Sequence, residues 1–207
     1  DDISAKKIKS NRDRKRVLYV ITNYYENAWY CGFTPPFNDI KYYIEQCNIV
    51  FGLIKIIENT NKAEMTIQLH PGANLHGKDP PWVDELENKK NIHLNREGNF
   101  VKMLDKHDVV IVDCLTTTLL EAISTKLPVF ALTSIISPPL HELTILEERA
   151  VCVANGVKLI EEVSKYLTSG YYPADIEDRG YLKLYGTHLD DAGSADRIIN
   201  DVEKIIS

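Results

Sequence analysis

The stretch from Asp108 to Thr133 (DVVIVDCLTTTLLEAISTKLPVFALT) constrains the fold more than any other part of the chain. Val109 to Val112 is a continuous run of β-branched residues, which is typical of a parallel strand covered on both faces. A threonine-rich turn and a helical segment follow, and Pro128 then precedes a second apolar run, Val129 to Leu132. Strand, helix and strand in this order predict a β-α-β unit of an α/β fold.

Three consecutive threonines, Thr116, Thr117 and Thr118, stand where the predicted helix begins. Their hydroxyls and the free backbone N–H groups of a helix start converge on one point, where the helix dipole is positive. This favours an anionic ligand, such as a nucleotide diphosphate, at the carboxyl edge of a parallel sheet. Glu121 lies about one turn further along an otherwise apolar helix start and needs a polar partner. The alternatives are a plain N-cap for Thr116 and a solvated helix residue for Glu121.

Strand-like and helix-like segments alternate along the rest of the chain. We expect further strands at residues 17–22, 65–69, 92–94 and 151–153, and helices at 40–58, 82–88, 100–106, 137–148, 156–167 and 194–206. The alternation predicts a Rossmann-like three-layer sandwich with a mainly parallel sheet of about six strands. Residues 1–16 are expected to form a charged leader or linker, and residues 17–207 a single domain. The first long helix is expected to bury an apolar face that contains Ile44, Cys47, Phe51, Leu53 and Ile54.

Length and charge narrow the function classes. A chain of 207 residues is long enough for one domain with a sizeable core. The formal charge of −6 argues against a nucleic-acid partner. Basic residues nevertheless gather in the leader, at Lys6, Lys7, Lys9, Arg12, Arg14, Lys15 and Arg16. A solvated leader is the simpler interpretation, and contact with an anionic membrane surface or polymer is the alternative.

The compartment is predicted from what the sequence lacks. No apolar run approaches the roughly 18 residues that a membrane span needs, and no signal-peptide pattern is present. Four cysteines, Cys31, Cys47, Cys114 and Cys152, show neither zinc spacing nor a disulfide framework. We therefore expect reduced cysteines and no metal or cofactor. The expected location is cytoplasmic, and the alternative within it is peripheral contact with the inner face of the membrane.

A larger pattern runs through these segments. A strand ending in His70-Pro71 is followed by a short strand, a short helix and the β-α-β unit, with matching positions at Leu104, Asp108 to Ile111, Asp113, Thr116 to Thr118, Glu121-Ala122 and Pro128-Val129. In this order they resemble the carboxyl-terminal half of GT-B glycosyltransferases, closest to bacterial surface-polysaccharide transferases and the CDP-glycerol glycerophosphotransferase group. The ending Gly193 to Ile199 is similar to the closing helix of surface-carbohydrate biosynthesis proteins. The resemblance covers about residue 17 to the end.

The resemblance implies an enzyme of GT-B type and a function in bacterial surface-polysaccharide biosynthesis. It implies that this half binds a nucleotide-sugar or nucleotide-polyol donor, whereas a separate amino-terminal half holds the acceptor. The leader is too short to form that second half, so we expect an acceptor-binding domain that is absent from this chain. By the same resemblance, the Thr116–Thr118 hydroxyls would bind the diphosphate, and the Glu121 carboxylate would accept from the ribose hydroxyls.

Side chains that follow the other strands are the remaining candidates, since ligands of open α/β sheets bind beyond the strand carboxyl ends. His70 is the candidate catalytic residue, because an imidazole there can contact a phosphate or protonate a leaving group. A histidine bonded to neighbouring backbone accounts for it equally well. Asn95 and Arg96 are candidates for contact with the base, with a surface ion pair as the alternative for Arg96. The other candidates for donor binding are Asn23, Asp113, Thr133 and Ser134.

Other chemistries lack their motifs. The sequence contains no GxGxxG, GxxxxGK[ST] or GxSxG motif, which argues against a dinucleotide oxidoreductase, a P-loop hydrolase and a serine hydrolase. No Asp-x-Asp is present, which argues against a metal-dependent transferase of GT-A type. Two alternatives to the transferase stay open: a non-hydrolysing nucleotide-sugar epimerase-like domain, and a binding or scaffold module that retains the fold without catalysis.

Overall fold

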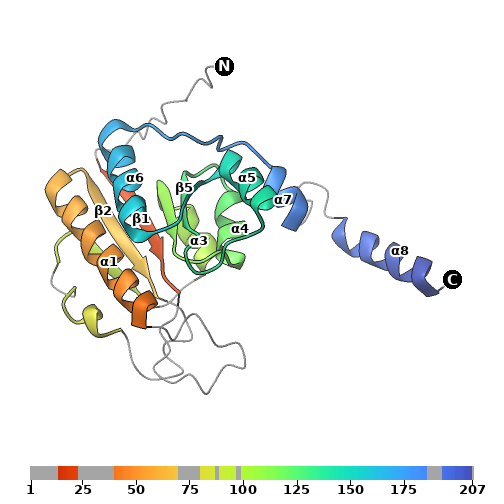
Figure 1. The fold of residues 1–207 in the computed structure, drawn as a ribbon, viewed down its shortest axis with the longest axis horizontal. Helices are drawn as coiled ribbons and strands as arrows, with labels where there is room; N and C mark the ends of the chain where they lie inside the picture. Colours follow the sequence, from red (N-terminus) through yellow and green to blue (C-terminus); the bar gives the residue numbers. More distant parts are fainter. Residues whose placement is uncertain are drawn as a thin grey trace.

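The computed structural model describes residues 14–22, 40–69, 80–86, 89–96, 99–185 and 193–206. Its centre is a six-stranded sheet with the order β3-β2-β1-β4-β5-β6, in which every neighbouring pair is parallel (Figure 1). The strands are β1 (Lys15–Val20), β2 (Ala63–Gln68), β3 (Ile92–Asn95), β4 (Val109–Val112), β5 (Val129–Leu132) and β6 (Val151–Val153). The predicted α/β class with a parallel sheet of six strands is confirmed.

Helices cover both faces of this sheet and make three layers. The helices α1 (Ile40–Thr60) and α6 (Gly156–Ser169) pack on one face. The other face is covered by α3 (Phe100–Leu104), α4 (Thr117–Ile123), α5 (Leu140–Arg149) and α7 (Gly180–Tyr185). Strand β4 shows why its residues are apolar throughout: Val109 and Ile111 face α1 and α6, whereas Val110 and Val112 face the opposite layer.

Most predicted elements lie within a few residues of the observed ones, and the differences have local causes. Strand β1 begins at Lys15, two residues before its predicted start. In the range predicted as a helix over 82–88, the described residues up to Leu86 form a 3-10 turn, η2 (Pro81–Val83), and a hydrogen-bonded turn after it. Helix α5 begins at Leu140 rather than at residue 137, because Pro139 is its N-cap. Helix α7 lies in a range where we expected no helix.

The buried face of α1 differs from the predicted one. Leu53 and Ile54 are buried as expected, but Ile44 and Phe51 are 51% and 40% exposed. The core-facing positions include two polar residues instead, Tyr42 and Gln46. Apolar periodicity alone therefore pointed to the wrong face at the start of α1, since a polar cluster rather than an apolar one lies beneath it.

Arg149, at the end of α5, is a buried cation in the layer that contains α4 and α5. Arg149 is 1% exposed, and its guanidinium donates to the backbone carbonyls of Ile123 (3.2 Å), Thr125 (2.7 Å) and Leu127 (3.0 Å). These carbonyls lie at the last residue of α4 and just after it, where the helix dipole is negative. Arg149 therefore holds the loop between α4 and β5 in place, and burial lowers its pKa.

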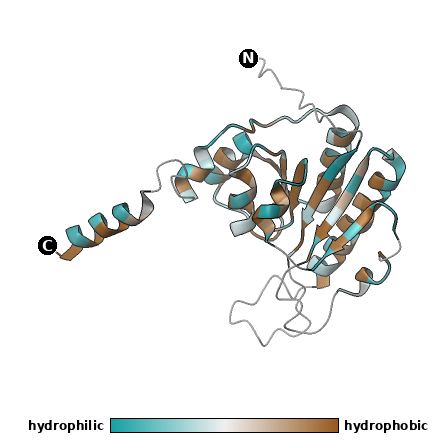
Figure 2. Ribbon diagram, turned by 180° about the vertical axis from the view of Figure 1, so that it is seen from behind, coloured by the Kyte–Doolittle hydropathy of each residue, from teal (hydrophilic) through white to brown (hydrophobic). Residues whose placement is uncertain are grey.

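The last helix, α8 (Ser194–Ile206), projects away from the sheet (Figure 1). Hydrophobic colour runs along one side of its ribbon (Figure 2). Its large apolar residues are exposed: Ile198, Ile199, Val202, Ile205 and Ile206. Among the helices in the described ranges, none is both long and apolar enough to cross a membrane.

Candidate functional site

The strand order reverses its direction between β1 and β4, and the polar candidates lie at this point. The chain runs from β1 outward to β3, then returns to β4 and runs outward to β6 on the other side. Ligands of open parallel sheets bind beyond the strand carboxyl ends at such a switch point. Thr22 follows β1 there, and Asp113 directly follows β4. The Thr22 backbone N–H and hydroxyl both donate to Asp113 Oδ1, at 2.8 and 2.7 Å.

Asp113 also joins this point to helix α1. Its second oxygen, Oδ2, accepts from the Gln46 amide at 3.1 Å and from the Tyr42 hydroxyl at 3.3 Å. The carboxylate is 1% exposed, and burial raises its pKa, although the hydrogen bonds from Thr22 and Gln46 act in the opposite direction. Both oxygens accept hydrogen bonds within the protein, so Asp113 links β1, β4 and α1, and its predicted contact with a donor stays a prediction.

The three threonines are placed as predicted, at the start of α4 on the carboxyl edge. Thr116 and Thr117 are exposed and Thr118 is half-buried. Thr116 occupies the N-cap position, but its side chain makes no capping hydrogen bond. Its hydroxyl instead pairs with the Thr118 hydroxyl at 2.9 Å. Thr116 is thus the N-cap residue by position, but its side chain does not cap the helix, and both hydroxyls are presented at the edge where a helix start has free N–H groups.

A second cluster forms where α1 meets the start of α6. The Glu45 carboxylate accepts from the backbone N–H of Gly156 at 2.9 Å and from the Ser134 hydroxyl at 3.1 Å. Gly156 is required here, because a Cβ would lie 2.6 Å from Ile49 Cγ1. Ser134, predicted to bind a donor, is exposed and already paired with Glu45. The carboxylate thus occupies the positive end of α6, where an anionic ligand would otherwise be favoured.

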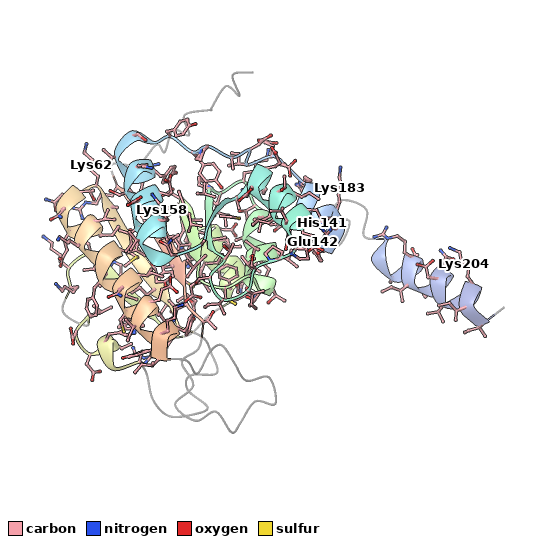
Figure 3. All side chains as sticks on the ribbon, viewed as in Figure 1. Lys62, His141, Glu142, Lys158, Lys183 and Lys204 are labelled. Atoms are coloured by element: carbon pink, nitrogen blue, oxygen red, sulfur yellow. The ribbon has the colours of Figure 1, made fainter. Side chains whose placement is uncertain are left out.

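The lysine at the start of α6 is paired within its own helix. Lys158 lies in the first turn of α6 (Figure 3), and its ammonium group pairs with Glu161 at 2.7 Å. The start of α6 is capped from within, since the Asn155 side chain accepts from the Lys158 backbone N–H at 2.9 Å.

Asn95 and Arg96 lie at the carboxyl end of β3, at the side of the sheet away from Ser134. The Asn95 amide donates to Gln68 Oε1 at 2.6 Å and contacts Met103 Sδ at 2.9 Å. The side-chain carbonyl oxygen of Asn95 is therefore the atom of its amide group that could bond to a ligand. Arg96 is half-buried. Their predicted contact with a base stays a prediction.

The remaining candidates divide into three groups. Thr133 is 8% exposed and its hydroxyl donates to the Val153 carbonyl at 3.1 Å, so its side chain stabilises the β5–β6 pair. Glu121 is half-buried on α4, one turn after the threonines, as expected. His70, the candidate catalytic residue, and Asn23 lie outside the described residues.

Sequence reasoning did not find Tyr42, Glu45 and Gln46, which organise both polar clusters. The signal was present, because Tyr42 and Gln46 are four residues apart and so share one helix face. Among the described residues, no three His, Cys, Asp or Glu side chains are grouped so as to hold a metal ion. The cysteines Cys47, Cys114 and Cys152 are free thiols, and burial raises the pKa of Cys114 to about 11. Such a thiol is a poor nucleophile near neutral pH.

No protein-family model and no curated protein matches this chain. Among solved structures, it is similar to the UDP-GlcNAc 2-epimerase of Methanocaldococcus jannaschii, with 18% identity, a TM-score of 0.55 and coverage of 92% of this chain and 46% of that one. It is also similar to S. aureus MnaA, solved with UDP (15%, TM-score 0.58, 97% and 50%). A third neighbour is the spinosyn rhamnosyltransferase SpnG (11%, TM-score 0.50, 84% and 40%).

These structures have in common the GT-B fold, and the likeness at such low identity shows the fold alone. The chain has a GT-B-like fold and spans half or less of the length of these neighbours. The predicted resemblance to GT-B proteins is thus confirmed at the level of fold.

Proposed function

We propose that this chain is the nucleotide-sugar or nucleotide-polyol donor-binding half of a GT-B glycosyltransferase that acts in bacterial surface-polysaccharide biosynthesis. The observation that carries the proposal is the GT-B-like half-fold with exposed threonine hydroxyls at the carboxyl edge of its switch point. Neighbours solved with UDP or UDP-GlcNAc support a ligand of this class.

In this proposal each group at the edge has a separate task. The Thr116, Thr117 and Thr118 hydroxyls and the start of α4 bind the diphosphate, and Glu121 accepts from the ribose hydroxyls. Asn95 and Arg96 contact the base. The reaction is displacement at the donor's anomeric carbon or phosphorus, and the threonine cluster stabilises the charge that develops on the leaving nucleotide. His70 is the candidate group for protonating that leaving group, and the acceptor is held by a domain outside this chain.

A thermal-shift and calorimetry screen against UDP, CDP, GDP, ADP, TDP and CMP tests the proposal. A ligand that binds only the folded state adds about 2.7 kcal/mol at a hundred times its dissociation constant, or roughly 5–10 °C in Tm for a domain of this size. We expect one nucleotide to stand out. The shift should be lost in Glu121→Ala and reduced in Thr117→Val.

The matched controls are Glu147→Ala and Thr168→Val. Both residues are exposed near the carboxyl-terminal ends of α5 and α6, at the opposite edge of the sheet, so their substitution should leave the shift unchanged. A flat response to all six nucleotides would contradict a donor site in this chain and would favour the scaffold alternative.

The epimerase alternative rests on the fold neighbours. One of them is a UDP-GlcNAc 2-epimerase, and another, MnaA, was solved with UDP. Product analysis of the protein with both halves separates the two enzymes. A transferase moves the sugar or polyol to an acceptor, whereas an epimerase returns an isomer of the sugar without any acceptor.

A further inference from the structure

Gln68 and Asn95 are the last residues of the neighbouring strands β2 and β3, and they pair in register at the carboxyl edge of the sheet. Gln68 is a buried polar residue with 5% exposure. Its side-chain nitrogen donates to the backbone carbonyl of Leu69 at 2.8 Å. Because a carbonyl oxygen only accepts, the backbone fixes which end of the Gln68 amide faces Leu69, and Oε1 is the end that meets Asn95.

The fixed amide of Gln68 sets the direction of the Asn95 amide in turn. Gln68 Oε1 accepts from Asn95 Nδ2 at 2.6 Å, and the same nitrogen contacts Met103 Sδ at 2.9 Å. A turned Asn95 amide would bring its oxygen against Gln68 Oε1, and two acceptors cannot bond to each other. The Asn95 nitrogen is therefore directed into the protein, and the oxygen is left for other contacts.

The oxygen of this amide, Asn95 Oδ1, is accessible from outside. No described residue donates a hydrogen bond to it, and it does not belong to the buried side-chain atoms that lack a partner. The side chain as a whole is half-buried. Strand β3 thus ends in an accepting oxygen whose direction the protein holds fixed.

An acceptor of fixed direction distinguishes nucleotide bases that have the same shape. Cytosine and adenine carry an exocyclic amino group, which donates, where uracil and guanine carry a keto oxygen, which accepts. The acceptor bonds to the base that has a donor at the contacted position and is left unpaired by the other base, which costs binding free energy. An amide that is free to turn offers its nitrogen or its oxygen and so serves both bases.

We propose that Gln68 is a positioning residue, which holds the Asn95 carbonyl oxygen toward the bound base and so lets this domain select between keto and amino bases. The inference rests on the proposed function, in which Asn95 contacts the base of the donor nucleotide. It adds the chemistry of the selection: an acceptor at the end of β3 pairs with an N–H group of the preferred base. Gln68 acts through Asn95 and does not touch the donor.

Calorimetric titration with UDP, CDP, GDP and ADP measures this selection. For the wild type we expect the dissociation constants within the UDP–CDP pair or the GDP–ADP pair to differ by at least about tenfold. Gln68→Met keeps the length of the side chain but removes Oε1, so the ratio should fall below about threefold. Asn95→Ala removes the acceptor itself at a half-buried position and should lower the ratio in the same way.

Thr66→Val is the matched control for lost stability. Thr66 lies two residues before Gln68 on the same face of β2, and its hydroxyl is hydrogen-bonded to His107 Nε2 at 3.0 Å. This substitution breaks a polar contact of the same strand without changing the partners of Asn95, so the Tm should fall while the base ratio stays at the wild-type value. Gln68→Glu keeps an oxygen in the place of Oε1 and should preserve the ratio that Gln68→Met loses.

An NMR measurement without ligand tests the positioning separately. The Asn95 side-chain amide signals are identified by their absence in Asn95→Ala. Their protons should exchange slowly with water in the wild type and in Thr66→Val, and at least about tenfold faster in Gln68→Met. An unchanged exchange rate or an unchanged base ratio in folded Gln68→Met would overturn the proposal.

The titrations also separate this proposal from the proposed function. Nucleotides that bind the wild type with equal affinity within each pair would overturn the selection and leave the donor site in place. Absence of binding for all four nucleotides would overturn the donor site itself, and the selection with it.

Discussion

Asp113 links three elements, β1, β4 and α1, at the carboxyl edge. It accepts from Thr22 on one oxygen and from Tyr42 and Gln46 on the other. Removing a buried acceptor leaves its donors without partners, which costs more than the lost bonds themselves. We therefore expect Asp113→Ala to lower the free energy of unfolding by about 3–5 kcal/mol, measured by urea unfolding.

Asp113→Asn is the control, since it keeps the shape and one carbonyl acceptor. The Thr22 donors can still be satisfied, whereas the new amide faces the Gln46 nitrogen, so the loss should lie between wild type and Asp113→Ala. A loss under about 1 kcal/mol in Asp113→Ala would mean that the network contributes little to stability.

At the scale of elements, α8 stands apart from the rest. Its apolar side chains are 47–84% exposed, so they contribute no core to the sheet and its covering helices. The double substitution Ile198→Asp and Ile205→Asp should therefore change the Tm of the domain by less than about 1 °C in calorimetry. Ile57→Asp, at a position of α1 that is 1% exposed, is the contrasting variant and should unfold the domain. A large loss in the α8 variant would show that this face is covered in solution.

At the scale of the whole molecule, the sheet separates two hydrophobic cores, one on each of its faces. Val109 and Val110 are neighbours in β4, both with 0% exposure, and their side chains enter opposite cores. Since the same strand supports both, the two layers should unfold together. Val109→Ala and Val110→Ala are each expected to lower the free energy of unfolding by about 2–3 kcal/mol and to shift one common calorimetric transition.

Val157→Ala, at a residue with 67% exposure, is the control and should leave that transition in place. Two separate transitions in either core variant would contradict a single cooperative domain.

The strands, and the sheet edge at which the candidate site lies, could be predicted from local sequence patterns. A strand buried on both faces must be apolar at every position, and β4 and β5 read so directly in the sequence. The threonines follow β4 in the chain, so a β-α-β unit places them at the carboxyl edge. What these residues bind stays a prediction.

Tertiary structure alone decided which polar groups meet. The donors to Asp113 come from residues 67 to 91 positions away in the sequence, and Glu45 meets Gly156 across 111 positions. No local periodicity encodes such pairings, and the polar residues on the core side of α1 ran against the apolar pattern by which we assigned its buried face. The sequence by itself determined the class of fold and the edge where polar side chains gather. The packing of α1 against β1, β4 and α6 decided which of them bond to one another and which face solvent, because burial forces each polar atom to find a partner wherever the chain brings one.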